Sequence, residues 1–294
     1  MATLPAMNAP AAYLVPASVD EAADALSDGE ATLLAGGTDL LLQTHQGVRA
    51  FRRTLVNISR IAELKTISLS GDRFRIGALV TITELLHSKL VCQHLPILAQ
   101  AADHFASDQI RNAATVGGNL CNASPAGDML PPLLALDATV ELACRKDHRL
   151  QRRNVPLDQF FLGPRRTAMA ADELLTAVEI PLPPARHYGR FFKLGTRPAL
   201  DISIISIALA GVLENRQLTG VRVAFGAVAP IPVRARRTEA ALEGRTLDAE
   251  VISTAVETAR AEATPISDIR ASAWYRSEMI FNMMRRLLHE AADA

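Results

Sequence analysis

Leu33-Leu-Ala-Gly-Gly-Thr-Asp39 is the stretch that decides the fold, because it places a glycine pair where a short apolar run ends. A glycine pair lets the backbone turn tightly, adopt positive φ and approach a ligand without an intervening Cβ. Consecutive main-chain N–H groups in such a turn form a concave site for an anion. The stretch therefore predicts a strand that runs into an anion-binding loop.

A second stretch of the same kind is Thr115-Val-Gly-Gly-Asn-Leu-Cys-Asn-Ala-Ser-Pro-Ala-Gly-Asp128. Each stretch ends in an aspartate that could hold ribose hydroxyls, so together they suggest a pyrophosphate held from two sides, as in FAD. Neither stretch has the spacing Gly-x-Gly-x-x-Gly, so a Rossmann arrangement on one helix N-terminus is not expected. The alternative is that both glycine pairs are only tight turns between a strand and a helix.

The composition of the 294 residues limits the class of protein. Hydrophobic residues make up 49%, and the 31 basic residues equal the 31 acidic ones, so the basic surface of a nucleic-acid-binding protein is not expected. No run of apolar residues is long enough for a transmembrane helix. Residues 1–17 lack a basic start followed by a long apolar segment, so we expect no signal peptide and a cytoplasmic protein.

The reactive side chains do not form a recognisable catalytic or metal site. Three cysteines are too few for an iron–sulfur cluster of the usual four thiolates, and we interpret Cys121 as a small buried residue behind the second loop. The seven histidines show no metal-ligand spacing, and no Gly-x-Ser-x-Gly motif marks a nucleophile. We therefore expect neither a metal site nor a catalytic side chain in this chain.

The best candidate for a domain boundary is Ile180-Pro-Leu-Pro-Pro184. It predicts two α/β lobes (about 1–60 and 61–182) followed by a domain over 183–294. In that domain three strands are expected over 188–194, 202–213 and 218–228, then helices over 238–242, 248–262 and 274–292. The fold class is therefore α+β, and we interpret the basic cluster Arg234, Arg236 and Arg237 as the solvated start of a helix.

Several ordered motifs identify a resemblance. The two glycine stretches, Gln109-Ile-Arg-Asn-Ala-Ala, Phe160-Phe-Leu-Gly-Pro-Arg-Arg-Thr, Phe192-Lys-Leu-Gly-Thr-Arg and Ser267-Asp-Ile-Arg-Ala-Ser-Ala-Trp-Tyr-Arg resemble the FAD-binding medium subunit of molybdenum hydroxylases. That family includes xanthine dehydrogenase and aerobic carbon monoxide dehydrogenase. The resemblance covers nearly the whole chain. It implies the two-subdomain flavin fold of the vanillyl-alcohol oxidase (PCMH) type and a C-terminal α+β domain of the carbon monoxide dehydrogenase flavoprotein type.

The resemblance also implies the residues that hold FAD. Main chain of both glycine loops would bind the pyrophosphate, Asp128 would bind a ribose, and Phe105 would pack on the cofactor. Leu175, Lys193 and Ile202 would lie near the adenine or the isoalloxazine, where the Lys193 cation would tune the flavin potential. The full set is Leu33, Leu34, Ala35, Gly36, Gly37, Thr38, Asp39, Phe105, Thr115, Val116, Gly117, Gly118, Asn119, Asp128, Leu175, Lys193 and Ile202. We expect Gly117→Val to lose flavin while the chain stays folded.

The resemblance implies an electron-transfer subunit. A large subunit would carry the molybdenum cofactor and a small subunit the iron–sulfur clusters, and FAD on this chain would reduce NAD+ or another acceptor. Two alternatives remain open: a self-sufficient flavin oxidase or dehydrogenase with its own substrate pocket, and a non-catalytic assembly protein of the same fold.

Overall fold

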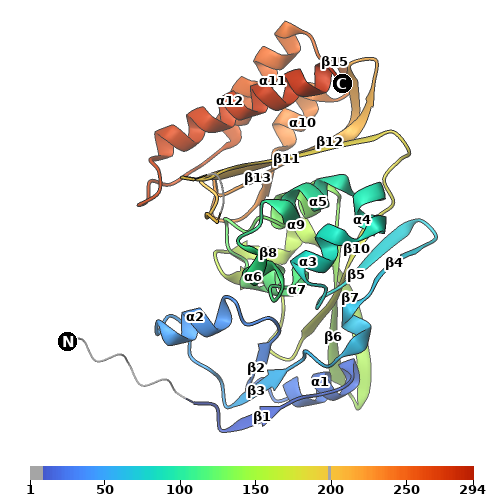
Figure 1. Ribbon diagram of the computed structural model, residues 1–294, viewed down its shortest axis with the longest axis vertical. Helices are drawn as coiled ribbons and strands as arrows, with labels where there is room; N and C mark the ends of the chain where they lie inside the picture. The colour runs from blue at the N-terminus through green and yellow to red at the C-terminus, as the bar shows by residue number, and fades with distance from the viewer. Residues whose placement is uncertain (1–8, 198–199) are drawn as a thin grey trace.

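Three sheets follow one another along the long axis of the molecule in the computed structural model (Figure 1). The structure describes residues 9–197 and 200–294. Residues 1–8, which belong to the segment where we expected no signal peptide, and residues 198–199 lie outside the described residues. Among the helices that are described, none is long and apolar enough to cross a membrane.

The first lobe is a small parallel sheet with one covering helix. Strand β3 pairs in parallel with both β1 and β2. Helix α1 begins where the Ser18 hydroxyl accepts the Glu21 N–H at 3.1 Å. Its apolar face packs into a core that residues of the small sheet share with Ala143 and Leu174 of the second lobe. The elements are β1 (Ala12–Leu14), α1 (Val19–Leu26), β2 (Ala31–Leu34), α2 (Leu40–His45), β3 (Thr54–Asn57) and the 3₁₀ helix η1 (Ala62–Lys65).

The second lobe is an antiparallel sheet of order β4-β5-β10-β6-β7, covered by short helices. Thr81 and Glu84 form a capping box at the start of α3. The strands are β4 (Ile67–Ser70), β5 (Arg73–Gly77), β6 (Thr139–Lys146), β7 (Arg149–Pro156), β8 (Phe161–Gly163), β9 (Arg166–Thr167) and β10 (Leu174–Pro181). The helices are α3 (Ile82–His87), α4 (Lys89–His94), α5 (Pro96–Asp103), α6 (Asp108–Arg111), α7 (Val116–Asn122), α8 (Leu130–Ala135) and α9 (Leu157–Phe160).

The C-terminal domain is an antiparallel sheet backed by helices, which confirms the α+β class. A tight turn joins β12 to β13, a longer segment joins β11 to β12, and β15 pairs with β13 at one end. The elements are β11 (His187–Leu194), β12 (Ile205–Glu214), β13 (Gln217–Gly226), β14 (Val233–Arg234), α10 (Arg236–Leu242), β15 (Arg245–Thr246), α11 (Ala249–Glu262) and α12 (Ala273–Ala292).

Strand β12 places large side chains on one face of this sheet and small ones on the other. Ile205, Ile207 and Leu209 belong to the apolar core shared with α11 and α12. Ala208 and Ala210 alternate with them and face the core of the second lobe, where α5 and α8 lie against the sheet. The sheet is therefore buried on both faces, between the helices of the second lobe and those of its own domain (Figure 1).

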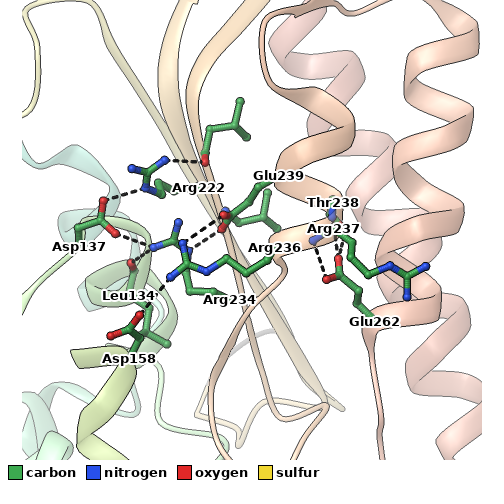
Figure 2. A network of polar contacts seen from close by, with 12 residues as sticks. Leu134, Asp137, Asp158, Arg222, Arg234, Arg236, Arg237, Thr238, Glu239 and Glu262 are labelled. Carbon is green, nitrogen blue, oxygen red and sulfur yellow. Dashed lines mark hydrogen bonds and ion pairs between the residues drawn. The ribbon is translucent and has the colours of Figure 1, made fainter. Parts of the chain in front are cut away.

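The basic cluster of the C-terminal domain joins the two domains, so its interpretation as a solvated helix start is wrong for Arg234. The Arg234 side chain is 4% exposed and pairs with Glu239 at 2.5 Å and with Asp137 of the second lobe at 2.6 Å. Figure 2 shows Arg222 on the same Asp137 carboxylate and Arg236 paired with Asp158. Arg236 is exposed, as expected, but its partner lies across the junction.

Candidate functional site

The first glycine loop leaves a row of backbone donors free. Strand β2 ends at Leu34 and α2 begins at Leu40, so the loop between them turns over Gly36 to Asp39. Among the described residues, no protein acceptor takes the N–H groups of Gly36, Gly37, Thr38 or Asp39. Gly37 has a φ of +72°, a conformation that favours glycine. A turn with consecutive unused N–H groups is suited to bind an anion.

The two glycine loops touch through their backbones. A Cβ added at Gly36 would overlap the carbonyl group of Ala113, two residues before Thr115. A Cβ at Gly117 would lie 2.8 Å from the Ala78 carbonyl oxygen and 3.0 Å from its Cα. Glycine at these positions therefore permits close backbone packing. This contact also changes the expectation for Gly117→Val, because its side chain would strike the backbone of Ala78 and disturb folding as well as flavin binding.

The second glycine loop uses its own donors inside the protein. Thr115 caps α7 by accepting the Gly118 N–H at 3.0 Å, and the N–H groups of Val116 and Gly117 bond to carbonyls of the loop after β5 at 2.9 Å. The Asn119 side chain is 9% exposed, and its Oδ1 atom is buried without a hydrogen-bond partner in the described structure. This loop therefore offers a side-chain amide to a ligand, whereas the first loop offers main-chain N–H groups.

A cavity of about 720 Å³ lies between the loops. Most residues expected to bind FAD line it: Leu33, Ala35, Gly36, Gly37, Thr38, Asp39, Phe105, Thr115, Gly117, Gly118, Asn119 and Leu175. The expected residues outside its lining are Leu34, Val116, Asp128, Lys193 and Ile202. The cavity thus combines apolar walls with polar groups at the loops, which is typical of a site for a cofactor.

Asp128 and Lys193 form a buried ion pair beside this cavity. Lys193 Nζ lies 2.6 Å from Asp128 Oδ2 and also donates to the His104 carbonyl at 2.9 Å. Ser203 donates to the other Asp128 oxygen at 2.6 Å. Burial raises the pKa of Asp128, and Lys193 and Ser203 oppose that shift. Because Phe105 follows His104 and lines the cavity, the pair lies at the edge of the site.

Ile202 is 48% exposed. It precedes Ser203 in the segment between β11 and β12. Strand β12 starts only at Ile205, later than expected, so Ile202 lies outside the sheet and on the surface next to the Asp128 pair.

Four arginines that line the cavity were missed by the sequence reasoning. They are Arg49, Arg52, Arg165 and Arg166, and Asp39 is the one carboxylate among the described lining residues. Burial raises the pKa of the Cys121 thiol in the wall to about 12, so this cysteine is protonated and fills space. Arg49, Arg52 and Arg165 lie in loops and Arg166 lies in the two-residue strand β9, where hydrophobic periodicity carries no information. Their only signal was the basic pair after Gly163-Pro164.

These features fit a dinucleotide. Free N–H groups and guanidinium groups suit a pyrophosphate, and the glycines let the backbone approach it. Phe105, Leu33 and Leu175 offer apolar surface to flat rings. Within the described residues no group of histidine, cysteine and acidic side chains is arranged to hold a metal ion.

Comparisons with known proteins agree with this site. The family described as the FAD binding domain in molybdopterin dehydrogenase matches residues 7–183, and the CO dehydrogenase flavoprotein C-terminal domain matches residues 190–291. The xanthine dehydrogenase FAD-binding subunit of Escherichia coli O157:H7 is 36% identical over 287 residues, 97% of each chain. The nicotine 6-hydroxylase medium subunit of Paenarthrobacter nicotinovorans is 34% identical over 95% of this chain and 96% of that protein.

The solved structures show the same architecture over the full length. Carbon monoxide dehydrogenase from Hydrogenophaga pseudoflava superposes with a TM-score of 0.91 at 32% identity, covering 96% of this chain and 97% of that chain. Quinoline 2-oxidoreductase from Pseudomonas putida 86 gives a TM-score of 0.88 at 29% identity, covering 99% and 98%. The chain therefore belongs to the family of FAD-binding subunits of xanthine and carbon monoxide dehydrogenase-type molybdenum hydroxylases, which are oxidoreductases.

Proposed function

We propose that this chain is the FAD-carrying electron-transfer subunit of a xanthine dehydrogenase-like hydroxylase. A large partner would hold the molybdenum cofactor, a small partner would hold iron–sulfur clusters, and NAD+ would be the final acceptor. The observation that carries the proposal is the turn from Gly36 to Asp39, whose main-chain N–H groups have no protein acceptor among the described residues. This turn contacts the second loop and lines a cavity that also contains arginines. The full-length similarity to proteins named as medium subunits supports the assembly.

The role of the chain is to bind and orient FAD, which supplies the transfer of one or two electrons when bound. Main-chain N–H groups of the first loop would hold the pyrophosphate, and Asn119 Oδ1 would accept a hydrogen bond from an N–H or O–H group of the cofactor. Phe105 and Leu175 would pack on the rings. Lys193 would lie at the edge of the flavin, held in place by Asp128 and the His104 carbonyl. Both Asp128 oxygens already accept a hydrogen bond, so a ribose hydroxyl would share them.

Anaerobic mixing of the flavin-loaded full-length chain with NADH tests the proposed acceptor. Hydride transfer between a flavin and a nicotinamide is reversible, so if NAD+ is the acceptor, NADH should reduce the flavin of the isolated chain and bleach its absorbance. Xanthine, used as a probe of substrate chemistry, should leave that absorbance unchanged, because hydroxylation would require the large partner.

Two other results would contradict the proposal in different ways. Bleaching of the isolated chain by xanthine would favour a self-sufficient flavin oxidase. A flavin that neither NADH nor the assembled complex with its substrate can reduce would favour the assembly protein.

A further inference from the structure

The hairpin of β8 and β9 holds an arginine at its tip in a conformation that favours glycine. Arg165 has a φ of +58°, follows Pro164, and lines the cavity. Its backbone N–H donates to the Ala123 carbonyl at 3.0 Å, which fastens the hairpin to the end of α7. A non-glycine residue at positive φ costs free energy, and such residues cluster at functional sites. An arginine at this position, in place of a glycine, therefore indicates a role for its side chain in the cavity.

The cavity wall carries more positive charge than the carboxylates in that wall can balance. Four arginines face one carboxylate, although the whole chain has a formal net charge of zero. Arg52 donates to the Gly29 carbonyl. Arg49, Arg165 and Arg166 make neither an ion pair nor a side-chain hydrogen bond within residues 9–197 and 200–294. These three guanidinium groups are free to bind a ligand.

Two of the free guanidinium groups, those of Arg49 and Arg165, come from different lobes and so from two sides of the cavity. Arg49 follows α2 in the first lobe and lies close enough to Cys121 of α7, in the second lobe, to lower the pKa of its thiol against the effect of burial. Arg165 belongs to the second lobe. It opposes the rise that burial causes in the pKa of Asp39, at the end of the first glycine loop. The cavity therefore has one free arginine from each lobe in its lining.

We propose that Arg49 and Arg165 close over the pyrophosphate of the dinucleotide from two sides and give the site its selectivity for a diphosphate. The proposal rests on the assignment of this cavity to FAD. The first glycine loop binds one side of the anion through main-chain N–H groups, and the two guanidinium groups bind its remaining oxygens with charge-assisted hydrogen bonds. Affinity for FAD is then salt-dependent, because the arginines and the ligand carry opposite charges.

Flavin binding to the full-length, flavin-free chain tests this proposal. Fluorescence quenching gives the dissociation constants for FAD and for riboflavin, which lacks phosphate, at low and high salt. Arg165→Gln and Arg49→Gln are each expected to weaken FAD binding about 10-fold or more, and to reduce its salt dependence. Riboflavin binding should be unchanged. Arg53→Gln is the matched control, since Arg53 is exposed, lies close in sequence, and is absent from the cavity wall.

Arg165→Gly separates binding from folding. Glycine relieves the positive φ at this turn, so the thermal midpoint of the flavin-free chain should stay the same or rise while FAD affinity falls. Wild-type affinity for FAD in both the Arg49 and the Arg165 variants would overturn the inference and leave the cavity assignment standing. Failure of the wild-type chain itself to bind FAD would overturn both.

Discussion

Gly36→Ala is expected to lower the FAD content of the purified chain. The added Cβ would overlap the carbonyl group of Ala113, and neither backbone can move without separating the two glycine loops. Overpacking of this kind costs about 1–3 kcal/mol. If that strain is relieved by displacing the first loop, FAD affinity falls about 10- to 100-fold, since each 1.4 kcal/mol is a factor of ten. The flavin-to-protein ratio of the purified chain measures the effect.

Gly163→Ala is the matched control for this substitution. A Cβ at Gly163 would find ordinary contact with the Arg166 side chain at 3.8 Å, and Gly163 does not line the cavity. This variant should retain the wild-type flavin content. If Gly36→Ala also retained its full flavin content, close contact between the loops would not be needed for FAD binding.

Lys193→Met is expected to have the largest effect on stability. Its ammonium group is the cationic partner of Asp128, and the two side chains are 7% and 10% exposed. Removing one partner of a buried ion pair leaves an uncompensated charge and typically costs about 3–5 kcal/mol. The same change removes the cation expected beside the flavin. Urea unfolding of the flavin-free chain gives the free energy of unfolding, and a redox titration of the loaded chain gives the flavin potential.

The loss caused by Lys193→Met should depend on pH in a defined direction. Burial already raises the pKa of Asp128 above the ordinary value of 3.8, and loss of Lys193 raises it further. A carboxyl group with a raised pKa binds more protons in the folded state, so stability falls as pH rises from the ordinary value through the raised one. The variant should therefore lose least stability near about pH 4 and most at neutral pH.

Asp128→Asn in the Lys193→Met background provides the control. The neutral amide keeps the shape of the carboxylate and removes the buried charge, so the double variant should recover much of the stability and lose the pH dependence. A double variant as unstable as Lys193→Met would show that packing, and not the charge, accounts for the loss.

Elements whose signals are local can be predicted from the sequence. Thr81-Ile-Thr-Glu84 has the spacing of a capping box and starts α3, and Gly71-Asp72 turns the chain between β4 and β5, because each signal depends only on neighbouring residues. The alternation of the C-terminal strands placed β11 and β13 within a few residues. Strand β7 was not predicted, since its residues are mostly polar and exposed, and its pairing with β6 supplies the missing stabilisation.

In the candidate site too, features with local signals could be predicted, and features that depend on distant segments could not. The glycine pairs could be found from the sequence because each pair consists of two adjacent residues at the end of an apolar run. Their contact through Ala113 and the approach of Arg49 and Arg165 depend on segments far apart in the chain. Arg234 illustrates this most clearly: the sequence places it in a charged run, whereas Asp137 and Glu239 make it a buried link between domains.

The most direct test of the central claim is the absorbance spectrum of the protein purified from its native host with its partners intact. The account predicts flavin bands together with iron–sulfur absorbance, a large and a small chain that co-purify, and bleaching of the flavin when the substrate of the complex is added without oxygen. A flavin-containing monomer that its substrate reduces directly, or a native complex without flavin, would contradict it.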